Sequence, residues 1–423
     1  MTMDSVVIVG AGHAGVEAAD ALRRNGYDGE VTLVDRSGHL PYQRPPLSKD
    51  YVTSAASPSP LPLRPSTFYD DNGINLRLGV GVDGIDRDRH AVRLADNAVV
   101  LFDHLILATG AQPRRLSCPG ADLDGVHHLH TVDDAARVHA ALTEASRVVV
   151  VGAGFIGLEF ASAVADREVP VTVLDVADRP MARVLSASSS HLFADLHESR
   201  GVQLCFGTGV QRIDGSGGHV TAVVDDSGTR HPADLVVVGI GAVPDTRLAC
   251  DSGLTVDNGV VVDEYLRTDD PHIFAVGDAA SFPGHHTAGR VRLEAVQNAT
   301  DQARCVAASI CGAPLPYSAV PWFWTVQCGR KLQIAGLPAT AEEMVRLGDP
   351  VADKGSILGF VDNSLAWVES VGAPADHLAA RTLLAHRPAP LTPERAREPG
   401  FSLKAHAKAV RAQLDVSESL VTL

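Results

Sequence analysis

Short apolar runs that end at glycine recur along the chain. Residues 6–9 read Val-Val-Ile-Val, and residues 148–151 are four valines. Runs of this length, rich in β-branched residues, are typical of strands buried on both faces of a parallel sheet. An alanine-rich stretch that favours a helix follows each run, and it leads to a second apolar run at residues 31–35 and 171–175. The pattern predicts two strand–helix–strand units.

In both units the first strand runs into the sequence Gly-x-Gly-x-x-Gly. The glycines are Gly10, Gly12 and Gly15 in the first unit and Gly152, Gly154 and Gly157 in the second. Asp35 and Asp175 end the next strands, 25 and 23 residues after the first glycine of their units. This spacing is the fingerprint of a dinucleotide site, in which pyrophosphate lies at the helix start. Two fingerprints indicate FAD and a nicotinamide cofactor; the alternative is two glycine-rich turns that bind no ligand.

Three later apolar runs extend these units. Residues 105–110 and 235–241 are each expected to close one unit, and both end in glycine, where backbone passes close to a ligand. Residues 273–276 read as a buried strand, followed by Gly277, Asp278 and an expected helix. Asp278 would accept hydrogen bonds from ribityl hydroxyls of FAD; the alternative is the N-cap of that helix, and one aspartate can have both roles.

Together these elements predict an α/β fold with two Rossmann-like dinucleotide-binding domains and a C-terminal α+β domain. We expect an FAD-binding domain from residues 1–112 and 245–316, an NAD-binding domain from residues 113–244 and a C-terminal domain from residues 317–423. Within the C-terminal domain, the expected elements are strands at 331–336 and 356–361 and a helix at 376–386.

Composition and charge exclude several other functions. The 423 residues are 45% hydrophobic and 21% charged, as in ordinary globular proteins. The net charge of -15 disfavours a nucleic-acid partner, and the sequence lacks the ~18-residue apolar stretch of a membrane span. Because no basic segment and removable apolar run open the chain, we expect a cytoplasmic protein with reduced thiols. None of the six cysteines forms a Cys-x-x-Cys pair, which disfavours a metal site or a thioredoxin-type dithiol.

The most specific segment is residues 41–49, Pro-Tyr-Gln-Arg-Pro-Pro-Leu-Ser-Lys. Together with Ala-Thr-Gly at 108–110, Gly-Asp at 277–278 and the segments 293–299 and 321–324, it resembles a family of flavoproteins. These are the ferredoxin reductases that serve Rieske-type dioxygenases and bacterial haem-thiolate monooxygenases. The resemblance covers nearly the whole chain. It implies a glutathione-reductase-like flavoprotein that passes electrons from NADH through FAD to a two-iron two-sulfur ferredoxin, which supplies such an oxygenase.

The motifs and the resemblance together give the candidate cofactor-binding residues. Those for FAD are Gly10, Gly12, His13, Ala14, Gly15, Asp35, Arg36, Arg44, Pro45, Lys49, Ala108, Thr109, Gly110, Gly277, Asp278, Glu294, Ala295, Val296 and Trp324. Those for NADH are Gly152, Gly154, Phe155, Ile156, Gly157, Glu159, Asp175, Arg183 and Gly241. Arg44 can neutralise pyrophosphate through its planar guanidinium, and the resemblance implies that Arg183 contacts NADH.

Three of these residues are candidates for a direct part in the reaction. Lys49 would be the cation near the reactive flavin nitrogen that stabilises the reduced anion; the alternative is a solvated charge in a proline-rich loop. The resemblance implies that Glu159 lies near the nicotinamide and that Trp324 covers the isoalloxazine edge. Glu159 would otherwise be a first-turn acid that complements the helix dipole. Trp322 and Trp324 would otherwise be core aromatics.

The positions of the cysteines bear on the electron route. Disulfide reductases of this superfamily carry a cysteine pair soon after the first unit, whereas the first cysteine here is Cys118. Because electrons on the flavin have no dithiol to reach, we expect hydride transfer from NADH and then single-electron transfer to the iron–sulfur protein. Asp175 favours NADH, since an acid there repels the extra phosphate of NADPH. Arg179 and Arg183 lie close by in sequence and keep NADPH possible.

The chain departs from the family pattern after Trp324. Serine, an acid and glutamine are usual there, and Thr325-Val326-Gln327 stands in their place. The departure puts in question the hydrogen bonds beside the flavin and the partner surface. Cys328 follows and reads as a small buried hydrophobe.

An acidic ferredoxin would need a local basic patch on this acidic chain. The candidates are Arg330 with Lys331, Arg290 with Arg292, and the helical face of Lys404, Lys408 and Arg411. Each can also be a solvated charged face. We expect no nucleic-acid or membrane partner, and a monomer or weak homodimer.

Two other functions stay open from the sequence. One is direct reduction of a small acceptor by an NADH-dependent flavoprotein, for which the altered segment 325–327 is the only motive. The other is a redox-sensing or scaffolding flavoprotein similar to the apoptosis-inducing factors. The lack of a long basic run in the sequence argues against the second.

Overall fold

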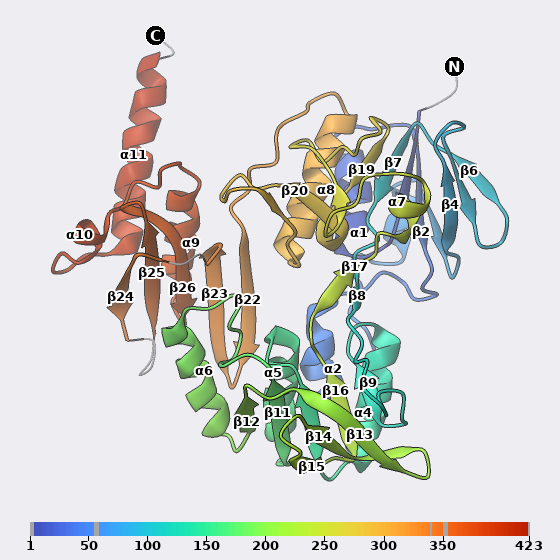
Figure 1. Cartoon of the computed structure of the whole chain (residues 1–423). Coiled ribbons are helices and arrows are strands. Elements are labelled where there is room, and N and C mark those ends of the chain that lie inside the picture. The colour runs from blue at the N-terminus through green and yellow to red at the C-terminus, as the bar shows by residue number, and fades with distance from the viewer. Residues whose placement is uncertain (1–3, 55–58, 339–340, 350–353, 422–423) are drawn as a thin grey trace. The chain divides into compact units, whose positions relative to one another are not determined.

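The computed structural model describes residues 4–54, 59–338, 341–349 and 354–421 (Figure 1). Its residues group into two compact units. The described residues within Met1–Pro45, Pro58–Pro113 and Ala242–Ala319 form the first unit, and those within Pro46–Ser57, Arg114–Gly241 and Val320–Leu423 form the second. The predicted division into three domains stays a prediction.

A five-stranded parallel sheet is the centre of the first unit. Its order is β19-β7-β1-β2-β3. The strands are β1 (Ser5–Val9), β2 (Glu30–Asp35), β3 (Ile74–Leu78), β7 (His104–Leu107) and β19 (Ile273–Ala275). Helix α1 (His13–Arg24) connects β1 to β2, and it packs against α8 (Val296–Ile310). The predicted first strand–helix–strand unit is confirmed, and residues 105–107 close it as expected.

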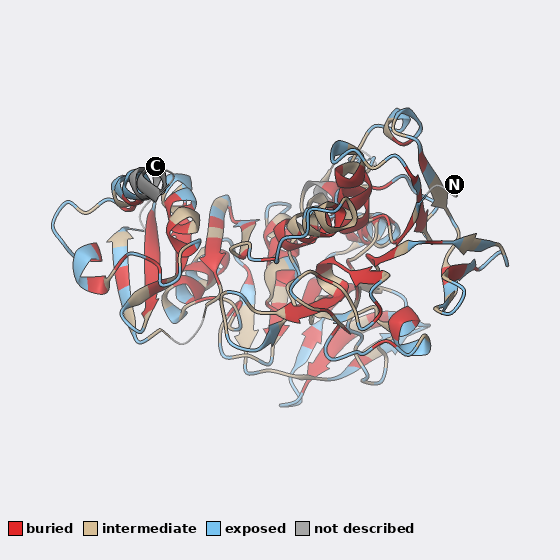
Figure 2. Ribbon diagram, turned by 90° about the horizontal axis from the view of Figure 1, so that it is seen from above, coloured by how far each residue is buried: buried red, intermediate tan, exposed pale blue. Residues whose placement is uncertain are grey.

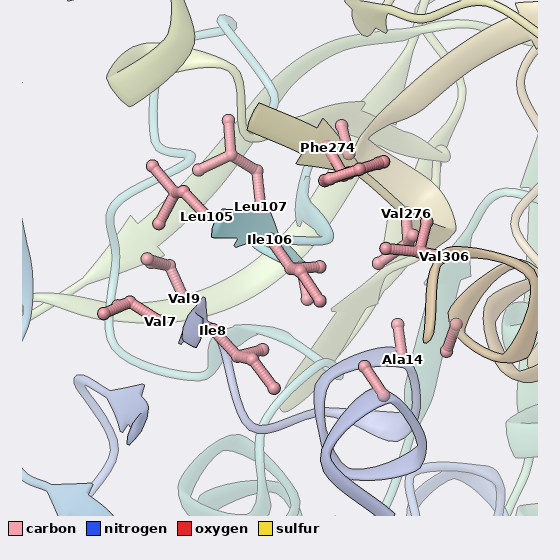
Figure 3. Packing of buried hydrophobic residues seen from close by; sticks show 14 of the residues in the cluster. Val7, Ile8, Val9, Ala14, Leu105, Ile106, Leu107, Phe274, Val276 and Val306 are labelled. Atoms are coloured by element: carbon pink, nitrogen blue, oxygen red, sulfur yellow. The ribbon is translucent and has the colours of Figure 1, made fainter. Parts of the chain in front are cut away.

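Apolar side chains hold this sheet to its helices. Figure 3 shows Val7, Ile8 and Val9 of β1, Leu105, Ile106 and Leu107 of β7, and Phe274 of β19 packed with Ala14 of α1 and Val306 of α8. All of them are buried. Full burial of such a side chain stabilises a fold by roughly 1.5–3 kcal/mol, so the β-branched runs of the sequence fix the sheet.

The second unit contains a sheet of the same design. Its order is β12-β11-β10-β16-β9, and every pair is parallel. The strands are β9 (Val126–His128), β10 (Val148–Val151), β11 (Val171–Asp175), β12 (Gln203–Phe206) and β16 (Leu235–Val238). Helix α5 (Phe155–Ala165) connects β10 to β11. The second predicted strand–helix–strand unit is therefore confirmed as well.

The helix expected after Asp278 is wrong. Residues Gly277–Ala279 form a single 3₁₀ turn, η2, and strand β20 (Ala280–Pro283) follows it at once. The chain turns to strand because Ala280 and Ser281 pair with Val260 and Val261 of β18. The N-cap position of η2 is Val276, so Asp278 is not an N-cap.

The C-terminal part of the second unit is an antiparallel sheet with helices on it. Its order is β22-β23-β26-β25-β24. The strands are β22 (Trp322–Gln327), β23 (Arg330–Gly336), β24 (Glu343–Gly348), β25 (Gly355–Val361) and β26 (Ser364–Val371). The helices are α9 (Pro374–Leu384), α10 (Pro393–Ala396) and α11 (Leu403–Val421). Helix α9 begins two residues before the predicted start because Pro374 is at its first turn, where proline is well tolerated.

Smaller elements complete both units. In the first unit they are α3 (Thr67–Asp71), β4 (Val82–Asp86), β5 (Ala91–Leu94), β6 (Val99–Leu101), β8 (Ala111–Pro113), β17 (Ala242–Pro244), α7 (Arg247–Asp251), β18 (Val260–Val261) and β21 (Arg290–Val291). In the second unit they are α2 (Asp50–Thr53), α4 (Val132–Glu144), α6 (Ala187–Glu198), β13 (Val210–Ser216), β14 (His219–Asp225) and β15 (Arg230–Pro232). A 3₁₀ turn, η1, covers Pro45–Ser48. None of the helices in the described part of the chain combines the length and apolarity needed to cross a bilayer.

The distribution of burial agrees with the predicted α/β class. Figure 2 shows buried residues concentrated in the strands and along the inner sides of the helices. In α11, for example, Leu403, Ala407 and Val410 are buried, and the charged residues between them are exposed.

Candidate functional site

The three glycines of the first loop differ in the space around them. A Cβ on Gly10, whose φ is +104°, would lie 2.3 Å from the carbonyl oxygen of Ala108. A Cβ on Gly15 would lie 1.8 Å from the carbonyl oxygen of Gly10. Around Gly12, by contrast, no described atom lies within 4 Å of the Cβ position. Packing thus requires the outer two glycines, and the middle one borders open space.

The second loop repeats this arrangement. The Cβ positions of Gly152 (φ +108°) and Gly157 lie 2.4 Å and 2.0 Å from backbone carbonyl oxygens, whereas the nearest atom to that of Gly154 is 4.0 Å away. Gly12 and Gly154 are the N-cap residues of α1 and α5, and neither helix receives a side-chain cap from the described residues. The first N–H groups of both helices are therefore available to phosphate oxygens, so both loops fit a dinucleotide.

The two acids that end the second strands make matching contacts. Asp35 accepts hydrogen bonds from the backbone N–H groups of Ala11, at 2.6 Å, and Ser37. Asp175 accepts them from Ala153, at 2.5 Å, and Ala177. An ionised carboxylate has about four acceptor sites. Each aspartate therefore stiffens its glycine loop and keeps capacity for a ribose hydroxyl.

The other predicted FAD residues of the first unit lie around the carboxyl ends of its strands. Ala14 of α1 lies beside Gly277, because a Cβ there would be 3.2 Å from that of Ala14. Thr109 donates to the carbonyl oxygen of Asp245, and Gly110 follows it with φ +70°. Ala108 follows β7 and is buried. Glu294 is exposed, Ala295 is the N-cap residue of α8, Val296 begins that helix, and Pro45 begins η1. The Arg36 guanidinium is 3.3 Å from the Asp245 carboxylate and largely exposed.

Two titratable groups here have perturbed pKa values. Burial, and secondly the carboxylate of Glu294, raise the pKa of Asp278 to about 6. Burial and the positive charge of Arg44 lower the pKa of His13 to about 4. At neutral pH, His13 is therefore uncharged, and Arg44 and the helix start supply the positive field that suits pyrophosphate.

In the second unit, Glu159 is the centre of a buried polar cluster. It lies in the second turn of α5, and its side chain is 7% exposed. One carboxylate oxygen, Oε2, accepts from Lys49 Nζ at 2.6 Å and from Ser48 Oγ at 2.5 Å. The other, Oε1, accepts from Thr325 Oγ1 at 2.7 Å. The alternatives of a first-turn acid and of a solvated Lys49 are therefore wrong.

Thr325 takes the serine position of the family pattern, and its hydroxyl makes the local hydrogen bond. Val326, at the position of the usual acid, is on the opposite face of β22 and 39% exposed. The departure therefore changes the surface and leaves the polar cluster intact. Ser48 and Thr325 were not among the predicted site residues. The only indication in the sequence was their position, since Ser48 precedes Lys49 and Thr325 follows Trp324.

The tryptophans lie on one face of β22. The rings of Trp322 and Trp324 are 5.5 Å apart at 32° to each other, and both residues are half-buried. Trp322 also packs edge to face against His377 of α9 at 5.3 Å, so it has a packing role, and the role of Trp324 stays a prediction. On the other face, Phe323 contacts Phe155 of α5 edge to face at 5.3 Å.

Two arginines predicted near the NADH site differ in whether their guanidinium groups can contact a ligand. Arg179 donates to the carbonyl oxygens of Leu185 and Ala182 and to Ser190 Oγ, so its guanidinium is committed to the local backbone. Arg183 is exposed and borders a cavity of about 290 Å³ with Ser186. Its guanidinium is 3.6 Å from the Cβ position of Gly241. Ile156 in the first turn of α5 is 47% exposed.

The candidate basic patches are not equivalent. Arg292 forms an ion pair with Glu294 at 2.7 Å with its side chain only 11% exposed, and Arg290 donates to the carbonyl oxygens of Val262 and Ser281. Glu294 therefore neutralises the charge of Arg292, whereas Arg290 is exposed; this pair as a docking patch stays a prediction. Lys331, Lys404, Lys408 and Arg411 are exposed, and Arg330 is half-buried. Cys328 is 6% exposed, which confirms it as buried.

Residues 4–303 match the family described as pyridine nucleotide-disulphide oxidoreductases, and residues 322–407 match the reductase C-terminal family. The chain belongs to the pyridine nucleotide-disulphide oxidoreductase family and carries the reductase C-terminal domain.

Several individual proteins are similar to this chain over nearly its whole length. Over 400 residues, the chain is 49% identical to rhodocoxin reductase of Rhodococcus erythropolis, covering 95% of this chain and 93% of that one. Putidaredoxin reductase of Pseudomonas putida is 37% identical over 97% of this chain and 98% of its own. Among solved structures, the ferredoxin reductase for the CYP199A2 system from Rhodopseudomonas palustris superposes with a TM-score of 0.93 at 41% identity, covering 96% of this chain and 100% of that one. A covalent putidaredoxin reductase–putidaredoxin complex gives a TM-score of 0.91 at 37% identity, over 96% and 99% of the chains.

Proposed function

We propose that this protein is an NADH-dependent ferredoxin reductase that uses FAD. The observation that carries the proposal is the ion pair between Lys49 and Glu159. Lys49 lies in the segment where disulfide reductases have their cysteine pair. Glu159 lies in α5, the helix that begins at the second glycine loop. A charge pair in that place supports transfer of electrons out of the protein, because it offers no thiol to receive them.

FAD, when bound, accepts a hydride from NADH and releases the two electrons singly. The chain's own residues bind, orient and supply charge. The N–H groups beside Gly12 would hold the FAD pyrophosphate, and those beside Gly154 would hold that of NADH. Asp278 would accept from ribityl hydroxyls, and Asp175 from the adenosine ribose of NADH.

Lys49 would provide the positive charge near the reactive flavin nitrogen, and Glu159 would orient that charge. Trp324, half-buried on β22, would cover the isoalloxazine edge. NADH is the proposed reductant because Asp175 ends β11, where an acid repels the extra phosphate of NADPH. Of the two nearby arginines, Arg179 donates to backbone carbonyl oxygens, and Arg183 is exposed.

The proposed partner is a two-iron two-sulfur ferredoxin that supplies a haem-thiolate monooxygenase or a Rieske dioxygenase. The relatives named rhodocoxin reductase and putidaredoxin reductase support this class. A Pseudomonas putida relative, 40% identical over 88% of this chain and 96% of its own, is named rubredoxin-NAD(+) reductase, so a rubredoxin belongs in the test. Lys331 with Arg330, and the exposed face of α11, are the proposed docking charges.

We place the protein in the cytoplasm, where NADH is supplied and where free thiols persist. The six cysteines are all free in the structure, which agrees with that location. A monomer or weak homodimer is the expected assembly.

The test is NADH-dependent cytochrome c reduction by the purified flavoprotein, with a two-iron ferredoxin, with a rubredoxin and with neither. A large ferredoxin-dependent rate supports the proposal. A rubredoxin-dependent rate alone changes the partner. Rapid reduction of a quinone with no rate from either protein favours the second candidate, direct reduction of a small acceptor, for which exposed Val326 in place of an acid is the motive.

A further inference from the structure

A line of buried side-chain hydrogen bonds leads away from Glu159. Thr325 Oγ1 donates to Glu159 Oε1 at 2.7 Å, and Gln327 Nε2 donates to Thr325 Oγ1 at 3.1 Å. Gln327 Oε1 lies 3.1 Å from Nε2 of His197 near the end of α6. These four residues are between 0% and 6% exposed. The line connects α6, β22 and α5, all within the second unit.

With the Gln327 amide nitrogen facing Thr325, each bond in this line has one direction. The Gln327 amide nitrogen can only donate, and it donates both to Thr325 Oγ1 and to the sulfur of Met181 at 3.6 Å. The Thr325 hydroxyl therefore has its own hydrogen left for Glu159. The Gln327 oxygen needs a donor, so Nε2 of His197 carries the hydrogen. Burial lowers the pKa of His197, and its Nδ1 has no partner among the described residues, which agrees with a neutral ring.

We propose that Thr325 and Gln327 are positioning residues, which fix the Glu159 carboxylate so that its other oxygen meets Lys49. The inference rests on the proposed function, in which Lys49 sets the charge beside the flavin. It assigns a role in tuning that charge to two residues of the C-terminal sheet.

The physical argument concerns the two oxygens of Glu159. Thr325 satisfies Oε1, while Ser48 and Lys49 share Oε2. If Oε1 loses its donor in a buried site, the carboxylate gains by turning toward Lys49, its remaining cation. The ammonium charge is then neutralised more strongly, and it stabilises a reduced anionic flavin less. The flavin midpoint potential should therefore become more negative.

The experiment compares three variants of the FAD-loaded protein. Thr325→Val keeps the shape and removes the hydroxyl, Thr325→Ser keeps the hydroxyl, and Val326→Thr adds one on the exposed side of the same strand. We expect Thr325→Val to slow flavin reduction by NADH five- to tenfold. Spectroelectrochemistry should show its potential lowered by about 30 mV, the shift that a tenfold change in equilibrium constant gives for a two-electron couple. Thr325→Ser and Val326→Thr should stay within twofold of the wild type.

A second comparison shows whether Thr325 acts through Glu159. Thr325→Val should have no additional effect on the potential in a Glu159→Gln background, because contacting residues that act as a unit are not additive. An unchanged potential in Thr325→Val, no rescue by Thr325→Ser, or an equal effect in the Glu159→Gln background would each overturn the proposal. The potential is measured without NADH or ferredoxin. Failure of the proposed function, seen as no NADH-dependent turnover in the wild type, is therefore a separate result.

Discussion

The ammonium nitrogen of Lys49 lies 2.6 Å from a carboxylate oxygen of Glu159, and the two residues are 110 positions apart in the chain. The Glu159 side chain is 7% exposed and that of Lys49 24% exposed. Because the acid is more deeply buried than its partner, the pair presents its positive end to the outside of the cluster. In the proposed function, this asymmetry would favour a reduced, anionic cofactor.

Removal of the Lys49 charge should affect both stability and electron uptake. Lys49→Met leaves Glu159 buried with only hydroxyl donors, so we expect a loss of about 1–3 kcal/mol in the free energy of unfolding. We also expect NADH to reduce the flavin at least tenfold more slowly, a barrier increase of about 1.4 kcal/mol. Urea unfolding and stopped-flow absorbance measure the two effects. Lys354→Met, at an exposed lysine, is the control; equal behaviour of the two variants would contradict the assigned role of Lys49.

Two glycines of the second loop should respond differently to alanine. Gly157→Ala places a methyl group 2.0 Å from the carbonyl oxygen of Gly152, so the helix must move and the protein should lose several kcal/mol of stability. Gly154→Ala meets no atom closer than 4.0 Å and should unfold like the wild type. Its methyl group would occupy the proposed phosphate position and weaken NADH binding at least tenfold.

Thermal unfolding and NADH titration separate these two effects. A Gly154→Ala protein that binds NADH normally would contradict the phosphate site. A stable Gly157→Ala protein would contradict the described packing of α5 against its loop.

The stability of the cofactor-free protein should depend on Asp278 between about pH 4 and pH 6. Its pKa is about 6 in the folded protein against an ordinary 3.8, so the folded state holds the proton more tightly than the unfolded state does. The stabilisation is present below pH 3.8 and is lost as the pH rises to 6, on the order of 3 kcal/mol in all. Asp278→Asn should remove this pH dependence, as measured by urea unfolding. Asp257→Asn, at an exposed aspartate, should leave it; a pH profile unchanged by Asp278→Asn would refute the assignment.

Charge reversal beside the tryptophans should weaken ferredoxin recognition. In Arg330→Glu/Lys331→Glu, the apparent Michaelis constant for ferredoxin should rise at least fivefold at low ionic strength, and the effect should fade as salt screens the charges. NADH-dependent ferricyanide reduction should stay unchanged. Lys354→Glu serves as the matched reversal. Ferredoxin kinetics that are insensitive to Arg330 and Lys331 would move the docking site to the face of α11.

Local patterns were sufficient to predict both glycine loops and their strands. The burial of residues 6–9 and 148–151 follows from their β-branched side chains, and the spacing to Asp35 and Asp175 follows from strand and helix lengths. The segment after Asp278 was predicted wrongly as a helix, because its strand depends on pairing with Val260 and Val261. Such pairing depends on residues distant in sequence, which local propensity does not report.

The partners of Glu159 show the same distinction within the site. The sequence identified Glu159 and Lys49 as candidates, but it could not assign the three donors to the two oxygens. Thr325 lies 166 residues from Glu159, and only the tertiary fold brings them together. By contrast, Glu294, the ion-pair partner of Arg292, is only two residues away in sequence, so that pair could have been predicted locally.

The position of β19 in the first sheet has a consequence for the order of biosynthesis. This strand covers the outer edge of β7, yet residues 108–272 leave the ribosome between the two. At cellular translation rates, the edge of β7 waits roughly 10–30 seconds for its neighbour. In the second sheet, by contrast, β16 emerges after both of its neighbours, β10 and β9, so neither of its own edges waits. A nascent chain interrupted before residue 273 therefore carries an open parallel edge, which is a template for aggregation and a natural substrate for chaperones.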